Sequence, residues 1–454
     1  MRKIRKFLSD KDVLTRAVDL RLYSYDAGTL WKHTPDLVLF PRSTQDVVEI
    51  MKIAHHHGIP VTPRGAGTNQ SGGSIPIKGG IVLCFSRMNR IIKIDRENRT
   101  ALVEPGVVLQ DLNLALSEKG LYFPPDPQSF FAATLGGIIA ENAGGPVCVK
   151  YGVTKQYILS MTIVLPDGNL VQCGGHTMNN FFGYDLATLM IGSEGTLGLV
   201  TRATLRLLAM PEAKYTVAAA FKSVRTAGEA VHKVISNGVI PAKSEFLDNW
   251  IIQKGETLCP VGFPQDAEAV ILFETDGTKQ SALLEAETIE KVCLGCGATW
   301  SNRAKSPEEA EKYWAARRAG FSAAFSSAPN ILTEDIVVPL KQIPTLLAGI
   351  KEISERHDVV TVVLGHAGDG NMHPDILTDR NDPEWFKRAE DALEEIIALA
   401  IQLEGVISGE HGIGLEKRRY MESSMDPAAI AVSKAIKNCL DPTGIMNPEK
   451  IWTH

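Results

Sequence analysis

Two glycine-rich turns in the second half of the chain carry side chains at spacings that suit metal binding. The first turn places His366 and His373 seven residues apart, directly after a strongly apolar segment. Such a turn folds the chain back on itself, so the two imidazoles can converge. The second turn, Gly409–Gly412, adds Glu410 and His411. Two imidazoles and one carboxylate form a facial ligand set for Zn²⁺, Mn²⁺ or Fe²⁺ that leaves positions open for a substrate.

Glu410 and His411 are adjacent but need not have the same role. If Glu410 faces a metal ion, the next side chain of an extended turn points elsewhere, so His411 can act as a base. An imidazole whose pKa lies near neutrality is the usual general base for a hydroxyl group. Ordinary turn capping by Asp369 and Asn371 is the alternative interpretation of the first turn.

A second candidate site is the segment Pro63–Gly73, with the sequence PRGAGTNQSGG, which follows a plausible short strand at 59–62. Its four glycines let the backbone turn sharply and point consecutive N–H groups at an anion, such as a pyrophosphate. The loop is not a Walker A motif, and Gln70 stands where the Rossmann fingerprint has its third glycine. A surface turn is the alternative interpretation.

Arg317 and Arg318 follow Tyr313 and Trp314 on an expected helix that starts near Pro307. An arginine can bind a carboxylate through two parallel charge-assisted hydrogen bonds. From the pattern alone, solvated helix charges are the favoured interpretation for both arginines.

The elements that must position these residues change in character near Pro211. Before it, apolar residues at helical spacing predict a helix over 44–57 that ends at Gly58, with His55–His57 as solvated caps. Other short patterns predict strands at 81–85, 91–94, 101–104, 159–165 and 198–208, and helices at 109–118 and 134–142.

Beyond Pro211, strand–helix–strand units replace the glycine-rich loops. The first unit comprises 216–221, 225–236 and 242–247, and the second comprises 331–338, 340–356 and 359–364. Helices are expected at 279–292 and 307–325, and a long charged helix at 383–404. This pattern predicts a second α+β domain with a mostly antiparallel sheet.

The composition narrows the class of protein. A chain of 454 residues, 44% hydrophobic and 22% charged, suits a soluble globular protein of two or three domains. Its net charge of −6 argues against general nucleic-acid binding. No apolar stretch of a signal peptide follows the basic N-terminus, and no run approaches the ~20 apolar residues of a membrane span.

The seven cysteines are scattered, and an odd number suits a reducing compartment, so we expect a cytoplasmic protein. Cys293 and Cys296 form a lone Cys-x-x-Cys pair. We interpret it as two buried small residues near a helix end, with a redox pair as the alternative.

Taken together, these residues resemble the flavin-dependent family of the vanillyl-alcohol-oxidase type, and within it the FAD-linked D-2-hydroxy-acid dehydrogenases. That branch includes the glycolate oxidase flavin subunit, D-lactate dehydrogenases and D-2-hydroxyglutarate dehydrogenase. The similarity covers nearly the whole chain. Pro63–Gly73 matches the pyrophosphate loop, and the two histidine turns match the metal-and-base motifs. The other matching segments are Pro125–Pro127, Thr134–Gly137, Glu141–Gly145, Lys150–Gly152, Gly192–Gly198 and Asn447–Lys450.

The resemblance implies an α+β protein with a PCMH-type two-subdomain FAD-binding fold and a ferredoxin-like substrate cap. It places the FAD-binding domain at 1–211, the cap at 212–411, and a C-terminal segment that returns to the FAD domain at 412–454. Covalently flavinylated relatives tether FAD through histidine or cysteine, and the loop between Pro63 and Ser74 has neither, so we expect dissociable FAD. The implied cofactor-binding residues are Pro63, Arg64, Gly65, Ala66, Gly67, Thr68, Asn69, Ser71, Gly72, Pro125, Asp126, Thr134, Gly136, Gly137, Asn142, Gly145, Tyr151, Gly152, Glu194, Gly195, Thr196, Gly198 and Asn447.

Carried over by position, His366, His373 and Glu410 resemble the ligands of a divalent metal (zinc, manganese or iron). His411 resembles the catalytic base. Arg317 resembles the arginine that holds the substrate carboxylate, which reverses the interpretation from pattern alone. The implied chemistry requires the nucleotide loop and the imidazole–carboxylate cluster to face one another across a single cleft.

Two departures from the family bear on the substrate. Where the hydroxyglutarate enzyme has a threonine and a lysine for the distal carboxylate, this chain has Phe321 and Thr333. Asp375 replaces an asparagine two residues beyond the second metal histidine. An apolar ring and an anion are poor partners for a second carboxylate. We therefore expect oxidation of D-lactate or glycolate to the 2-oxo acid, with D-2-hydroxyglutarate as the alternative.

Reduced flavin must pass its electrons on, and the chain lacks a four-cysteine set of its own. An electron-transfer flavoprotein or an iron–sulfur subunit is therefore the expected partner, with direct use of O₂ as the alternative. Two other classes of function remain open. One is an FAD transferase resembling alkylglycerone-phosphate synthase, and the other is a metallohydrolase whose glycine loop holds a substrate phosphate.

Overall fold

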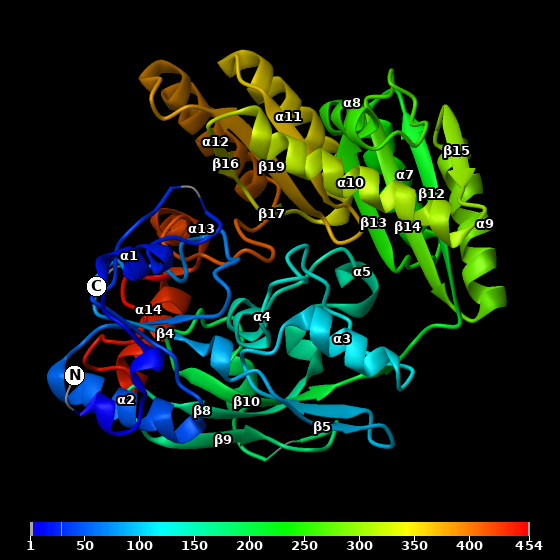
Figure 1. The fold of residues 1–454 in the computed structure, drawn as a ribbon. Helices are drawn as coiled ribbons and strands as arrows, with labels where there is room; N and C mark the ends of the chain where they lie inside the picture. Colours follow the sequence, from blue (N-terminus) through cyan, green and yellow to red (C-terminus); the bar gives the residue numbers. More distant parts are fainter. Residues whose placement is uncertain (1–2, 29, 181, 453–454) are drawn as a thin grey trace. The chain divides into compact units, whose positions relative to one another are not determined.

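The structure is a computed structural model that describes residues 3–28, 30–180 and 182–452, without the side chain of Phe321. The chain forms two compact units, drawn in Figure 1. Unit 1 comprises Met1–Gly144, Val153–Met210 and Glu410–His454, and unit 2 comprises Gly145–Gly152 and Pro211–Gly409. The segment 145–152, which the expected boundaries place in the FAD-binding domain, belongs to unit 2.

The strands of unit 1 are β1 (Val13–Leu14), β2 (Leu37–Leu39), β3 (Val61–Arg64), β4 (Ile81–Cys84), β5 (Ile91–Asp95), β6 (Thr100–Val103), β7 (Leu121–Tyr122), β8 (Ile158–Val164), β9 (Leu170–Gly174), β10 (Leu199–Arg206) and β11 (Leu208–Ala209). One sheet has the order β1-β2-β4-β3, in which β4 runs parallel to both β2 and β3. Another has the order β5-β6-β10-β8-β9 and is antiparallel throughout. β7 pairs with β11.

The helices of unit 1 are α1 (Ala17–Leu20), α2 (Thr44–His57), α3 (Leu109–Ser117), α4 (Leu135–Glu141), α6 (Leu186–Met190), α13 (Met421–Ser424) and α14 (Pro427–Leu440). The predicted bounds of α2 are confirmed, because local signals define both ends. Ser43 and Asp46 form a capping box at its start, and Gly58 ends it in the left-handed conformation.

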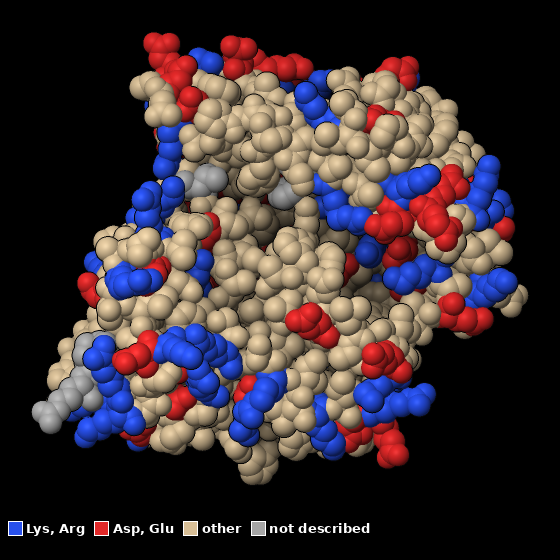
Figure 2. Space-filling model, viewed as in Figure 1, with Lys and Arg blue, Asp and Glu red and all other residues tan. Residues whose placement is uncertain are grey.

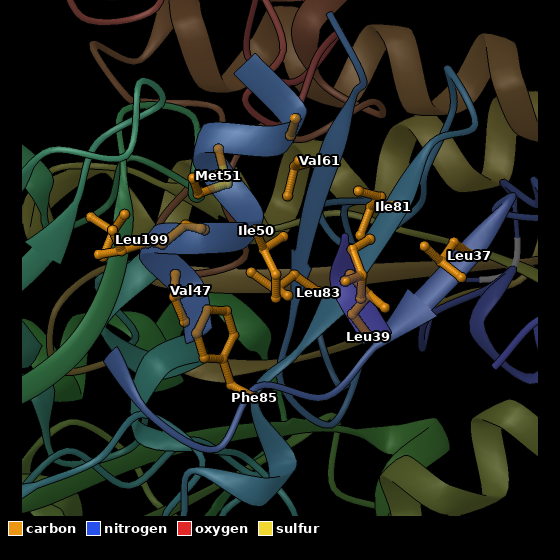
Figure 3. Close-up of a cluster of buried hydrophobic side chains, with 14 of the residues drawn as sticks. Leu37, Leu39, Val47, Ile50, Met51, Val61, Ile81, Leu83, Phe85 and Leu199 are labelled. Carbon is orange, nitrogen blue, oxygen red and sulfur yellow. The ribbon is translucent and has the colours of Figure 1, made fainter. Parts of the chain in front are cut away.

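The apolar face of α2 packs on the parallel sheet. Figure 3 shows Ile50 of α2 beside Leu83 of β4 and Val47 beside Phe85, within one buried cluster. Ile445 and Met446 from the end of the chain join the same buried cluster. The C-terminal segment is therefore part of the core of unit 1, and its Met446 pairs with Val61 of β3, the strand that leads into the glycine-rich loop.

The elements of unit 2 are α5 (Cys148–Tyr151), β12 (Ala213–Phe221), α7 (Val224–Ser236), β13 (Lys243–Asp248), α8 (Asn249–Leu258), β14 (Ala269–Gly277), α9 (Lys279–Gly295), β15 (Trp300–Arg303), α10 (Pro307–Ser327), β16 (Asn330–Thr333), β17 (Ile336–Val337), α11 (Ile343–His357), β18 (Thr361–His366), β19 (Asn371–Thr378) and α12 (Pro383–Gln402). Their sheet has the order β15-β12-β14-β13-β18-β19-β16, with β17 on β19, and every pairing is antiparallel. The predicted α+β class with an antiparallel sheet is confirmed.

The first half of this sheet is ferredoxin-like. Its elements run β12-α7-β13-β14-α9-β15, with α8 inserted, and its strands have the spatial order fourth, first, third, second. α8 and α10 cover one face, where they pack against Leu247, Leu364 and Leu377. α7, α9, α11 and α12 contact one another along the opposite face.

Three further features match or qualify the sequence predictions. Basic and acidic side chains are interspersed on the face shown in Figure 2. Within the described residues, every helix is too short or too polar to cross a membrane. Cys293 is buried in the last turn of α9, and burial raises the pKa of its thiol to about 12, which favours the structural interpretation over a reactive thiolate.

Candidate functional site

The hairpin of β18 and β19 brings His366 and His373 together. His373 lies opposite Leu364 in the register, and Leu364 shares a face of β18 with His366. Both histidines are buried, with their ring centroids 5.2 Å apart in an edge-to-face arrangement. A ring nitrogen of each lies within 4.8 Å of the other, which suits two ligands of one metal ion.

Glu245 of β13 links His366 to Arg317. It lies opposite His366 in the register and is fully buried. Its Oε1 is 2.5 Å from Nδ1 of His366, and its Oε2 accepts hydrogen bonds from Nε and Nη2 of Arg317 at 2.9 and 2.8 Å. Burial raises the pKa of Glu245, but its interactions with His366 and Arg317 outweigh that effect and hold the pKa below its ordinary value. This carboxylate is therefore ionised at neutral pH.

Asp335 fixes the segment that leads to Glu410. Its Oδ2 accepts hydrogen bonds from the Ser408 hydroxyl at 2.9 Å and from the Gly409 N–H at 2.8 Å, while its Oδ1 lies 3.8 Å from Nδ1 of His373. A Cβ on Gly409 would come within 2.4 Å of the Asn371 side chain, so only glycine fits here. The chain is thus anchored beside His373 one residue before Glu410.

Glu410 and His411 open the last segment of unit 1. Oε1 of Glu410 is 4.0 Å from Nε2 of His411, and both side chains are partly buried. Two imidazole nitrogens and one carboxylate oxygen are the kinds of donor that suit zinc, manganese or iron.

Asp375 and Thr333 face each other across β19 and β16 on the same side of the sheet as His373. Asp375 is fully buried, and burial raises its pKa to about 7, although a hydrogen bond with Thr333 opposes this. Phe321, the other residue of the expected substrate pocket, has its side chain outside the described residues.

In unit 1, the glycine-rich loop leaves β3 with its backbone N–H groups unused. The N–H groups of residues 65–70 donate to no other group in the described part of the chain. Gly67 and Gly72 adopt positive φ values of 77° and 80°. Successive N–H groups in such a turn form a concave anion site. This arrangement fits the expected pyrophosphate.

Hydrogen bonds made by side chains hold the glycine-rich loop in place. Nη1 of Arg64 donates to the Tyr25 carbonyl at 2.7 Å and to the Ser74 hydroxyl at 3.1 Å. The Asn69 amide donates to Asp26 at 2.8 Å. Arg64 therefore supports the loop from within rather than reaching out toward a phosphate.

Buried polar atoms near the loop lack partners, as a cofactor site requires. The hydroxyl oxygens of Ser71 and Thr134 have no hydrogen-bond partner among the described residues. Thr134 packs directly on Gly65, and a Cβ on Gly137 would meet nothing closer than the Thr134 hydroxyl at 3.6 Å. Unpaired hydroxyls beside open space are suited to bind a polar ligand.

The C-terminal segment is hydrogen-bonded both to the glycine-rich loop and to the turn that contains Glu194. Glu194 accepts hydrogen bonds from the N–H groups of Ile413 and Gly414 at 2.7 and 2.8 Å. The Asn447 amide donates to the carbonyls of Gly73 and Glu194 at 3.0 and 2.7 Å. These bonds join segments more than 200 residues apart in the sequence.

Glu141 adds a second buried carboxyl group. Burial, followed by the negative charges of Glu194 and Asp26, raises its pKa well above the ordinary value. Burial also raises the pKa of Glu194, against the effect of its two backbone hydrogen bonds. Burial therefore favours the neutral forms of both carboxyl groups, which limits the negative charge that an anionic cofactor would meet.

The other expected cofactor residues divide between the units. Pro63 packs on Gly195, and Thr196 donates its hydroxyl to the Ser193 carbonyl at 2.7 Å. Ala66, Thr68, Pro125, Asp126, Gly136, Asn142 and Gly198 also lie in unit 1, whereas Gly145, Tyr151 and Gly152 lie in unit 2.

The unit 2 segment 145–152 has its own anchor. The Tyr151 hydroxyl donates to Asp276 at 2.7 Å, and Nζ of Lys150 lies 2.6 Å from the other oxygen of that carboxylate. The structure therefore ties these two residues to the sheet of unit 2.

Sequence reasoning missed Glu245 and Asp335. A weak signal exists for Glu245, because a carboxylate stands directly before the apolar residues Phe246 and Leu247 of a buried strand. For Asp335, the Glu-Asp pair between two apolar strands was the available signal.

Two family models together match most of the chain. Residues 35–174 match the FAD binding domain family, and residues 210–451 match the family of FAD linked oxidases, C-terminal domain. The chain is 40% identical to glycolate oxidase subunit GlcD of Bacillus subtilis, over 95% of this chain and 92% of that protein. It is 34% identical to D-lactate dehydrogenase of Anaerostipes hadrus, over 94% of this chain and 92% of that protein.

The fold itself is that of solved PCMH-type flavoproteins. The structure of p-cresol methylhydroxylase with substrate bound superposes with a TM-score of 0.82 at 18% identity, covering 99% of this chain and 95% of that one. The two matching families and the near-complete coverage of the relatives lead to one assignment. The chain belongs to the FAD-linked oxidase family and is an FAD-dependent oxidoreductase.

Proposed function

We propose that this enzyme oxidises a small D-2-hydroxy acid, D-lactate or glycolate, to the 2-oxo acid. The observation that carries the proposal is the buried cluster of unit 2, in which one carboxylate holds both His366 and Arg317 on the face that also carries His373. The arginine can bind a carboxylate, and the two imidazoles near it can bind a metal ion. This combination suits a substrate that has a carboxylate next to a hydroxyl group. The names of the two relatives support the same class of substrate.

Each residue has a definite task in the proposed reaction. Arg317 binds the substrate carboxylate and so orients the α-carbon. A divalent ion held by His366, His373 and Glu410 would lower the pKa of the α-hydroxyl group. His411 accepts the hydroxyl proton. FAD, held by the loop of unit 1, would supply the redox chemistry by accepting the α-hydrogen as a hydride.

The inclusion of Glu410 follows from the chain path. Gly409 is hydrogen-bonded to Asp335, whose other carboxylate oxygen lies 3.8 Å from His373. The next residue in the chain is Glu410, and its side chain is the one hard oxygen ligand in the second turn. His411 follows directly, which suits a base adjacent to the activated hydroxyl group.

Asp375 favours a substrate with one carboxylate. It is a fully buried acidic side chain on the face of His373, so it offers no cation to a second carboxylate. A second carboxylate at this position would lack a partner, whereas the methyl group of D-lactate or the hydrogen of glycolate needs none. D-2-hydroxyglutarate is therefore the disfavoured substrate.

The cofactor is proposed to bind without a covalent bond, because residues 64–73 contain neither histidine nor cysteine. The electrons are proposed to pass to an electron-transfer flavoprotein or an iron–sulfur protein. A relative named as a subunit makes a separate protein partner reasonable.

Anaerobic reduction of the flavin tests the proposal. D-lactate and glycolate should bleach the flavin absorbance, L-lactate should not, and D-2-hydroxyglutarate should do so poorly. Denaturation with acid should release the cofactor into the supernatant. A yellow protein that none of these acids reduces would reject the proposal and favour a non-redox transferase.

A chelator separates the metal from the rest of the mechanism. After treatment with dipicolinate, the rate of reduction by D-lactate should fall and should recover on addition of Zn²⁺ or Mn²⁺. Full activity in metal-free protein would remove the metal ion from the proposal but leave the hydroxy-acid chemistry standing.

A further inference from the structure

Glu245 is the least expected member of the cluster in unit 2. It lies within β13 beside the apolar residues Leu247 and Leu272 of the same face, and none of its side chain is exposed. A charge in such a position costs free energy unless its partners compensate for it. The residues that bind the Glu245 carboxylate therefore indicate its role.

The two oxygens of Glu245 serve different side chains. Oε2 accepts from Nε and Nη2 of Arg317, and Oε1 is bonded to Nδ1 of His366. Arg317 comes from α10 and His366 from β18, so one carboxylate fixes two elements that approach it from different directions. An aspartate, which is one methylene shorter, could not reach both.

The bond to Nδ1 determines the state of His366. A carboxylate at 2.5 Å accepts the Nδ1 proton and leaves Nε2 as the nitrogen with the lone pair. Ligand histidines in metal sites commonly have this carboxylate partner, which fixes the tautomer, orients the ring and makes the imidazole a better ligand. Loss of such a partner costs about 10–100-fold in metal affinity.

The bonds to Arg317 determine the direction of its guanidinium group. Nε and Nη2 lie along one edge of the planar group, and Glu245 occupies that edge. The remaining edge is thereby set in a fixed orientation. A carboxylate anchor that is ordered before the substrate arrives loses less side-chain entropy on binding.

We propose that Glu245 is a positioning residue that orients the metal ligand His366 and the substrate anchor Arg317 at the same time. The proposal rests on the proposed function, because it assigns to those two residues the roles given above. It adds that metal binding and carboxylate binding depend on one side chain and weaken together when that side chain changes.

The chain offers a matched control in the adjacent strand. Glu274 of β14 is also a buried carboxylate of the same sheet, and its ion pair is with Lys214 at 3.2 Å. E245Q and E274Q make the same chemical change in neighbouring strands. E245D keeps the charge but shortens the side chain, and near-ultraviolet circular dichroism of each variant checks that the fold is retained.

The first measurement is the affinity for a metal ion. It uses enzyme that retains FAD but has been stripped of metal, and a chromogenic chelator competes with the protein for Zn²⁺ or Mn²⁺. E245Q should bind both ions about 10–100-fold more weakly than the wild type. E274Q should bind them as the wild type does. E245D should fall between the two, and it replaces E245Q if the latter does not fold.

The second measurement is steady-state turnover of D-lactate at saturating metal. E245Q should show a raised KM, because the guanidinium group is no longer ordered, and excess metal should restore part of its kcat. A merely structural carboxylate would show neither the KM increase nor rescue by metal.

The possible results distinguish a failure of the Glu245 proposal from a failure of the metal ligand set. If the wild type binds Zn²⁺ or Mn²⁺ and E245Q binds them equally well, the Glu245 proposal is overturned while the proposed function stands. If the wild type binds neither ion, the metal ligand set fails, and the Glu245 proposal fails with it. A lower affinity in E245Q but not in E274Q, together with the KM increase, supports the proposal.

Discussion

The two units build their polar sites from different parts of the chain. In unit 1 the site is made of backbone, with glycines at positive φ and with N–H groups of residues 65–70 that donate to no acceptor among the described residues. In unit 2 it is made of side chains that meet on one face of a regular antiparallel sheet. A backbone site tolerates changes of side-chain chemistry but not of side-chain volume. A side-chain site responds in the opposite way, because each charge there depends on a buried partner.

The largest expected effect comes from the proposed base. His411→Ala should lower kcat with D-lactate by about 10²–10⁴-fold and flatten the pH–rate profile on its acid side, because the hydroxyl proton loses its acceptor. Stopped-flow measurement of flavin reduction over a range of pH values tests this. His357→Ala is the control, because His357 is hydrogen-bonded to Glu395 at 2.8 Å near the surface of unit 2. Turnover near that of the control would remove His411 from the mechanism.

Arg317→Ala should produce the next largest effect, and on stability as well as activity. It leaves Glu245 fully buried without its cation, which costs about 3–5 kcal/mol in comparable proteins. Urea unfolding followed by intrinsic fluorescence measures this loss. Arg318→Ala, one residue along the same helix, should change little, since Arg318 is exposed and paired with exposed Glu311. Equal stabilities of the two variants would show that the buried pair with Glu245 contributes little.

The same difference between the units explains what the sequence could predict. The glycine loop and α2 have local signals, since positive φ, capping and helical periodicity are written into consecutive residues. The convergence of His366 and His373 was also predictable, because one short hairpin joins them. These features need no knowledge of which distant segments pair.

Glu245 could not be found in this way. It precedes His366 by 121 residues, and the register between β13 and β18 brings them together. Shifting that register by one residue would turn the carboxylate to the opposite face. The attachment of Lys150 and Tyr151 to Asp276, about 125 residues away, was missed for the same reason. Tertiary pairing at this range leaves no periodic pattern in either segment.

The side-chain character of unit 2 also predicts a pH dependence. Burial raises the pKa of Asp248 from 3.8 to about 7, even though the N–H groups of Ile251 and Val363 donate to it. A carboxyl group with a raised pKa stabilises the fold at low pH, and this contribution is lost as the pH rises through the folded-state value. The free energy of unfolding should therefore fall by up to about 4 kcal/mol between pH 4 and 7 from this group.

Asp248→Asn isolates that contribution. The amide cannot ionise, so the slope of stability against pH should be smaller than in the wild type. Its single acceptor oxygen leaves one backbone N–H unpaired, which lowers stability by about 1–3 kcal/mol at every pH. Guanidinium unfolding at pH 5 and pH 8 distinguishes the two effects. Parallel curves for the two proteins would mean that Asp248 is already ionised at pH 5.

The smallest expected effect, and the one that tests the backbone character of unit 1 most directly, comes from Gly67→Ala. Gly67 has a φ of 77°, which costs a residue with a Cβ about 1–2 kcal/mol. The new Cβ would also lie 2.1 Å from Nη2 of Arg64. That guanidinium group is held by Tyr25 and Ser74, so it cannot move aside without losing both hydrogen bonds. FAD titration of the apoprotein should show a Kd about tenfold higher. Gly58→Ala is the matched control, since its φ is 62° and no atom lies near its Cβ position, so it should weaken the end of α2 without changing FAD affinity. If both variants bind FAD equally well, the N–H groups of the loop are not what holds the cofactor, and the backbone site in unit 1 is disproved.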